Sequence, residues 1–153
     1  MKRRGWRAEV GASTVEFALA ATILFMLILG IMEMSLALYT HHMLSEAARE
    51  GTRYAMVRGD TCVVSGASCT TSAAQIQSYV QGLGYPGINA AKLTVTTTYS
   101  AYPAGSGCTP NSNCANPGNL VTVTLVYPFS LHIPFVSSST LTMTSTSANV
   151  ISQ

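Results

Sequence analysis

The sequence is poor in charge. Lys and Arg together number 8 and Asp and Glu number 6, so charged residues make up 9% of the 153-residue chain, against about 25% in soluble globular domains. Hydrophobic residues make up 48% of the chain, and its mean hydropathy is +0.31. This composition disfavours a disordered chain, a nucleic-acid-binding protein and an ordinary cytosolic enzyme. It indicates a membrane-associated or exported protein with no nucleic-acid partner.

The few charges are also unevenly distributed. From Thr61 to Gln153 the only charged side chain is Lys92, in a stretch rich in Ser, Thr, Asn, Gly and Tyr. The other charges lie before Thr61, as a basic cluster at the start of the chain, two isolated carboxylates and a mixed cluster: Lys2, Arg3, Arg4, Arg7 and Glu9; Glu16 and Glu33; Glu46, Arg49, Glu50, Arg53, Arg58 and Asp60. This pattern predicts a helical, membrane-associated part up to about Gly59 and an uncharged exported part after it.

Patterns typical of catalysis and metal binding are missing. The sequence has no G-x-S-x-G, no H-E-x-x-H and no Walker loop, and no carboxylate follows Asp60. General acid–base catalysis needs a positioned proton carrier, which the exported part lacks apart from His132. The pair His41-His42 has no third ligand at a useful spacing. We therefore expect a protein that is not an enzyme, with no catalytic residue, no metal site and no cofactor.

One long apolar run is present. Phe17 to Leu38 is interrupted only by Glu33 near its far end, and as a helix it would be about 33 Å long, enough to cross the hydrocarbon core of a bilayer. A buried core helix is the alternative, but no other predicted element could surround it. A cleaved signal peptide would have a shorter run of about 7–15 residues, followed by a small-x-small cleavage site. We predict a retained single-pass anchor in membrane lipid, spanning about residues 17–38.

The basic cluster predicts how this anchor is oriented. Positive residues favour the cytoplasmic side of a membrane, so Lys2, Arg3, Arg4 and Arg7 place the N-terminus in the cytoplasm. Arg49, Arg53 and Arg58 beyond the run reduce the bias. We expect the protein in the cytoplasmic (inner) membrane, with its C-terminal domain outside and a possible location in pili at the cell surface.

The junction before the apolar run is more specific. It reads Gly11-Ala12-Ser13-Thr14-Val15-Glu16-Phe17, which resembles the prepilin leader of type IV pilins and pseudopilins. The resemblance implies that a prepilin peptidase cuts between Gly11 and Ala12, and that Glu16 serves assembly as the fifth mature residue, followed by Phe17. A carboxylate on a membrane helix needs a partner, and the new amino group of Ala12 could supply it. Otherwise Gly11 is a flexible junction, and Glu16 a carboxylate favourable to the helix dipole.

A second motif extends this resemblance. The run Ala47-Ala48-Arg49-Glu50-Gly51-Thr52-Arg53-Tyr54-Ala55, together with the junction and the apolar run, resembles the TadE-like family of the tight-adherence (Tad/Flp) pilus system. The family implies a minor pseudopilin that acts in pilus assembly and surface adhesion, with the prepilin peptidase and other Tad/Flp pilins and pseudopilins as partners. Two alternatives remain: an accessory protein of the pilus machine that stays in the membrane, and an unrelated membrane-anchored adhesin.

The rest of the chain predicts a small mixed domain. Helical periodicity continues to Val57, with an apolar stripe formed by Leu36, Met43, Ala47 and Tyr54. Residues 72–83 predict a short amphipathic helix, and alternation of apolar with Thr or Ser residues predicts strands near 93–99, 120–127 and 141–148. The expected fold is α+β: a leader at 1–11, a long N-terminal helix at 12–58, and an exported domain at 59–153 in which a short helix and a small antiparallel sheet cover part of the long helix.

The four cysteines predict two disulfides. Four cysteines allow three connectivities, and exported proteins favour disulfides over metal sites. Cys62 and Cys69 share one turn-rich loop, and Cys108 and Cys114 share another. We therefore expect the local pairs Cys62–Cys69 and Cys108–Cys114.

Overall fold

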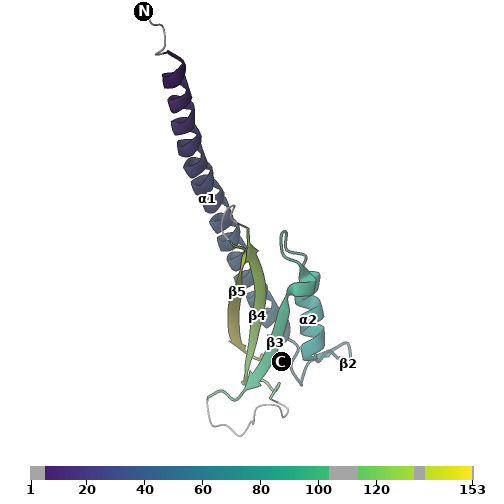
Figure 1. The fold of residues 1–153 in the computed structure, drawn as a ribbon. Helices are drawn as coiled ribbons and strands as arrows, with labels where there is room; N and C mark the ends of the chain where they lie inside the picture. The colour runs from purple at the N-terminus through teal and green to yellow at the C-terminus, as the bar shows by residue number, and fades with distance from the viewer. Residues whose placement is uncertain (1–5, 104–113, 133–136, 153) are drawn as a thin grey trace, which may run out of the picture.

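One long helix organises the fold. The computed structural model describes residues 6–103, 114–132 and 137–152, with side chains from Gly11 onward. Helix α1 runs from Trp6 to Met56, 51 residues without a proline, and is about 76 Å long. The helix expected at 12–58 thus starts earlier and ends two residues sooner. Its N-terminal part projects away from the rest of the molecule (Figure 1).

The remaining elements form a compact layer against the second part of α1. In chain order they are the two-residue strands β1 (Val63–Val64) and β2 (Ala67–Ser68), helix α2 (Ala73–Gly82), the 3-10 turn η1 (Ala90–Lys92), and strands β3 (Thr94–Ser100), β4 (Leu120–Leu131) and β5 (Ser139–Val150). Strands β3, β4 and β5 form an antiparallel sheet in that order. The predicted α+β fold, with a long helix, a short helix and a small antiparallel sheet, is confirmed.

Strand β4 forms the centre of the core. Its residues Val121, Val123, Leu125 and Tyr127 alternate with less buried neighbours and are all buried, as period-2 alternation predicts. They pack in one cluster with residues of α1, α2 and β5. β4 continues past the predicted end at Tyr127 through Pro128 to Leu131. β3 pairs with β4 only as far as Val126, which lies opposite Thr94, the first residue of β3. At Pro128, β4 therefore has one neighbouring strand instead of two, and a proline is tolerated there.

Helix α2 has a clear start signal. Ser72 is the N-cap; its side chain accepts a hydrogen bond from the backbone N–H of Gln75, and the Gln75 side chain accepts one from the Ser72 backbone N–H. This capping box satisfies two N–H groups that a helix start leaves without partners. Ile76 and Val80 are buried against the core, so α2 presents one apolar face inward, as predicted.

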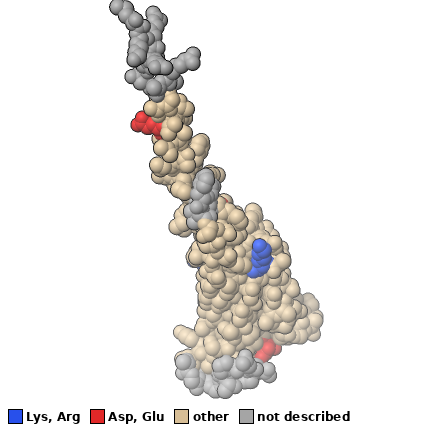
Figure 2. All heavy atoms as spheres, in the orientation of Figure 1, with Lys and Arg blue, Asp and Glu red and all other residues tan. Residues whose placement is uncertain are grey.

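The other face of the sheet is covered with hydroxyl groups. Thr94, Thr96 and Thr98 of β3 are exposed, and the hydroxyls of Thr124 and Thr146 lie 3.2 Å apart across β4 and β5. Strands β3, β4 and β5 contain no charged residue, and Figure 2 shows few charged atoms on this side of the molecule. The sheet therefore has one apolar face and one uncharged polar face.

The loop expected between Asp60 and Thr71 contains a small hairpin that periodicity did not predict. β1 pairs with β2, and the two residues between them, Ser65 and Gly66, have φ angles of 53° and 82°. Two successive positive φ values are typical of the type I′ turn that favours two-residue hairpins. The strands are two residues long and exposed, too short for alternation to be detected in sequence.

Candidate membrane and assembly site

The first half of α1 is a bare apolar helix. Its side chains from Gly11 to Leu36 include no buried residue. It is the one helix among the described residues that is long and apolar enough to cross a membrane, and none of its most apolar 18-residue window is buried. The alternative of a core helix is therefore wrong for this segment, because nothing described in the chain covers it. We refer to residues 11–36 as the bare half of α1.

The predicted processing and assembly residues all lie at the start of this bare half. Gly11, Ala12, Glu16 and Phe17 are helical and exposed, with Phe17 75% exposed. Glu16 forms no ion pair with a described residue. Ala12 and Glu16 are four residues apart, so they lie on the same side of the helix within one turn. The basic residues Lys2, Arg3 and Arg4 lie outside the described residues, as do the side chains of Arg7 and Glu9.

The second half of α1, residues 37–56, packs against the sheet and α2; we call it the packed half. Its buried residues are mostly small: Ala37, Thr40, Leu44, Ala47, Ala48, Gly51, Thr52 and Ala55. Of the predicted stripe, Ala47 is buried and Tyr54 packs against the core, whereas Met43 is only partly buried and Leu36 is 53% exposed. Small residues, rather than large apolar ones, occupy the buried side because they let the helix axis approach the sheet closely.

Gly51 marks the tightest point of this packing. A Cβ atom at Gly51 would lie 2.8 Å from Cγ2 of Val80 on α2 and 3.4 Å from Cγ1 of Val123 on β4. Beside it, the buried hydroxyl of Thr52 lies 2.8 Å from the carbonyl oxygen of Ala48 and 3.2 Å from that of Ser147 on β5. The run of residues 47–55 therefore joins α1 to α2, β4 and β5 at once. Sequence reasoning assigned no such role to Gly51 or Thr52.

The opposite side of the same run carries charge. Glu46 and Arg49, and Glu50 and Arg53, form exposed i,i+3 ion pairs at 3.7 and 3.8 Å. Exposed pairs of this kind stabilise a helix by about 0.2–0.5 kcal/mol each. They form a solvated surface of α1.

An aromatic stack links α1 to α2 at the edge of this charged side. The rings of Tyr54 and Tyr79 are stacked at 4.0 Å, the guanidinium of Arg58 lies 3.9 Å from the Tyr54 ring centroid, and the Tyr79 hydroxyl donates to Glu50 Oε1 at 3.0 Å. That hydrogen bond is the main reason the pKa of Tyr79 is raised. Burial, followed by the charges of Glu46 and Glu50, raises the pKa of Tyr85.

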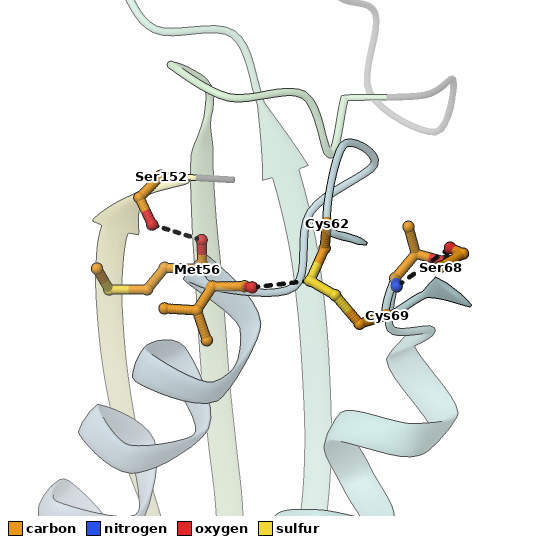
Figure 3. Close-up of a disulfide and its surroundings, with 7 residues drawn as sticks. Met56, Cys62, Ser68, Cys69 and Ser152 are labelled. Atoms are coloured by element: carbon orange, nitrogen blue, oxygen red, sulfur yellow. Dashed lines mark hydrogen bonds between the residues drawn. A yellow bond between two sulfur atoms is a disulfide. The ribbon is translucent and has the colours of Figure 1, made fainter. Parts of the chain in front are cut away.

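The far end of α1 is closed by contacts from distant parts of the chain. The backbone N–H and the hydroxyl of Ser152 both donate to the Met56 carbonyl oxygen, at 2.9 and 3.2 Å, which satisfies a carbonyl that a helix end leaves free. The predicted Cys62–Cys69 disulfide is present directly after this helix end (Figure 3). Cys114 is buried and disulfide-bonded; Cys108, its predicted partner, lies outside the described residues.

The histidines and carboxylates of the described ranges do not gather into a metal site. No group of three or more His, Cys, Asp or Glu side chains that could hold a metal ion occurs there. His41, His42 and His132 are exposed.

Comparison with known proteins identifies the same region. The family model of TadE-like proteins matches residues 11–53, and the predicted resemblance is thereby confirmed. The match begins at Gly11, covers the bare half, and ends within the packed run that contains Gly51. No curated protein and no solved structure matches the chain. A TadE-like segment joined to an exposed apolar helix fits a membrane protein related to the Tad pilus.

Proposed function

We propose that this TadE-like chain is a minor pseudopilin of a Tad/Flp pilus, inserted in the membrane by the bare half of α1 and cut after Gly11 by a prepilin peptidase. One observation carries the proposal: the TadE-like match extends from Gly11 through a helix half in which no residue is buried by the described part of the chain. An apolar helix of this length needs lipid or other apolar helices around it. A membrane provides the first environment and a pilus core provides the second.

Glu16 is the residue that would distinguish these environments. At the end of an apolar run a carboxylate can reach the headgroup region, where its cost is small. Inside a bundle of packed helices the same group would need a partner, because an unpaired buried charge is strongly destabilising. Cleavage after Gly11 would place a free amino group on Ala12, within one helical turn of Glu16 and also available to a neighbouring subunit. Glu16 therefore serves assembly more than folding in this proposal.

Incorporation into sheared filaments tests the proposal. Glu16→Gln should leave the amount of chain in the membrane unchanged and should lower the amount that co-purifies with filaments. Glu33→Gln is the matched control: it removes the only other carboxylate of the bare half, at the opposite end, and should be incorporated like the unmodified chain.

Two results would contradict the proposal. Equal incorporation of Glu16→Gln and the unmodified chain would remove the role given to Glu16. A chain that is abundant in membranes and absent from filaments would favour the alternative of an accessory protein that stays in the membrane.

A further inference from the structure

The end of the β4–β5 hairpin lies at the level where the bare half of α1 stops. The Thr52 hydroxyl lies 3.2 Å from the Ser147 carbonyl oxygen, and this contact fixes the position of β5 along the α1 axis. From Thr52 to Leu36 the helix rises about 24 Å, and from Ser147 to Leu141 the strand rises about 20 Å. Leu141 therefore lies within about one helical turn of Leu36 along the α1 axis. Figure 1 shows this end of β4 and β5 beside the middle of α1.

This level coincides with the edge of a bilayer that encloses the bare half. From Phe17 to Leu36 the helix is about 30 Å long, the thickness of a bilayer hydrocarbon core. The headgroup region adds about 5–8 Å on each side. The hairpin end would therefore meet the headgroup region when the bare half spans the membrane.

The surface at this level is apolar on both elements. Leu141 is 47% exposed and lies opposite Phe129 in the sheet, and Tyr39 on α1 is 40% exposed. We call the set the collar; it consists of Leu36, Leu38, Tyr39, Leu131 and Leu141. Tyrosine is enriched at membrane–water interfaces because its ring is apolar and its hydroxyl is polar.

The collar also lacks the charges that would keep it in water. Strands β4 and β5 have no charged residue, and on α1 the stretch from Phe17 to Ser45 contains one, Glu33. The first ion pair among the described residues, Glu46–Arg49, begins about two turns beyond Tyr39. Burying the collar at a headgroup boundary therefore desolvates no charged side chain of the sheet.

We propose that the collar is a second membrane contact, in which the hairpin end of β4 and β5 rests in the boundary between phospholipid headgroups and acyl chains. The contact fixes how deeply the anchor sits and holds the sheet against the membrane. The inference rests on the proposed membrane anchoring but goes beyond it, because a span alone does not require the sheet to touch lipid.

Fluorescence in vesicles tests the contact. Leu141→Trp is made in a Trp6→Phe background, so that it carries the only tryptophan, and the full chain is reconstituted in phosphatidylcholine vesicles at a low protein-to-lipid ratio. The emission of this tryptophan should shift to shorter wavelength and should be quenched when the acyl chains are brominated near the headgroups. Thr98→Trp, on an exposed position of β3 far from the collar, is the matched control and should show neither change. Leu131→Trp is a second probe should Leu141→Trp fail to fold.

The possible outcomes distinguish the proposed collar contact from the proposed membrane anchoring. If the chain sediments with vesicles but the collar tryptophan behaves like that at position 98, the anchor stands and the collar is wrong. If the chain does not sediment with vesicles, both are wrong. If the emission shifts only at high protein-to-lipid ratio and without bromine quenching, a second copy of the chain covers this surface, and the proposed lipid contact is wrong.

Discussion

The two halves of α1 have the same backbone geometry but opposite surroundings. The bare half carries large apolar side chains that no other described segment buries, whereas the packed half carries small residues on one side and charge on the other. Hydropathy therefore does not indicate which half is buried. Burial depends on small residues that admit the sheet and α2, while large exposed residues require an environment outside the chain.

The TadE-like match covers both halves. Residues 11–53 contain the proposed processing site, the bare half and most of the packed run. The bare half would supply the surface for lipid or neighbouring helices in the proposed function, and Gly51 and Thr52 attach the sheet and α2 to the packed half. A change in the bare half should thus alter membrane or filament behaviour, and a change in the packed half should alter the stability of the layer formed by the sheet and α2.

The largest difference in stability is expected between two Leu→Ala substitutions, one in each half of α1. Leu44 is fully buried, and Leu27 is 57% exposed on the bare half. Leu44→Ala should destabilise the layer formed by the sheet and α2 by about 2–5 kcal/mol, the usual cost of a core cavity. Leu27→Ala should leave its unfolding unchanged. Urea unfolding of the full chain in detergent micelles, followed by tyrosine near-UV circular dichroism, measures both; equal midpoints would show that the packed half is not part of the core.

A smaller difference in stability is expected between substitutions of two threonines whose hydroxyls make the same hydrogen bond within α1. The hydroxyls of Thr22 and Thr52 each donate to the carbonyl four residues earlier at 2.8 Å, but only Thr52 also reaches β5, at Ser147. Thr52→Val should cost about 0.5–1.5 kcal/mol, the range for one hydrogen bond, and Thr22→Val should cost nothing in the same unfolding measurement. A loss as large for Thr22→Val would mean that the bond within the helix, rather than the contact with β5, is what stabilises the layer.

The smallest effect is expected from alkaline pH, in the layer formed by the sheet and α2. The pKa values of Tyr79, Tyr85 and Tyr99 are raised, by the hydrogen bond to Glu50 in the first case and chiefly by burial in the others. A phenol with a raised pKa holds its proton more tightly in the folded chain. Stability should therefore be constant below the ordinary tyrosine pKa of about 10 and should fall as pH rises through and beyond it.

Tyr79→Phe checks this pH dependence. The substitution removes the hydroxyl that donates to Glu50 and should reduce the alkaline loss without abolishing it, because Tyr85 and Tyr99 remain. Unfolding midpoints of the two proteins at several pH values on either side of 10 measure the difference. A loss of stability identical in both proteins would show that Tyr79 does not contribute.

Prediction from sequence succeeded where a single periodicity decides the structure. The alternation of Val121, Val123, Leu125 and Tyr127 predicted the buried face of β4, and the apolar run predicted an uncovered helix. The buried side of the packed half was not predicted, because Ala48 and Gly51 carry little hydropathy and their importance depends on how closely Val80 approaches. The contact of Glu50 with Tyr79 depends on how α2 returns to α1, which no local pattern specifies.

The central claim is that the bare half is the processed, assembly-competent part of a pseudopilin. Intact-mass spectrometry of the chain purified from membranes of its own cells tests this most directly, with Gly11→Leu as the blocked variant. Gly30→Leu is its control, because a side chain at Gly30 also meets open space. The account predicts an N-terminus at Ala12 in the unmodified chain and in Gly30→Leu, and full-length chain in Gly11→Leu. An unmodified chain that still begins at Met1 would contradict it.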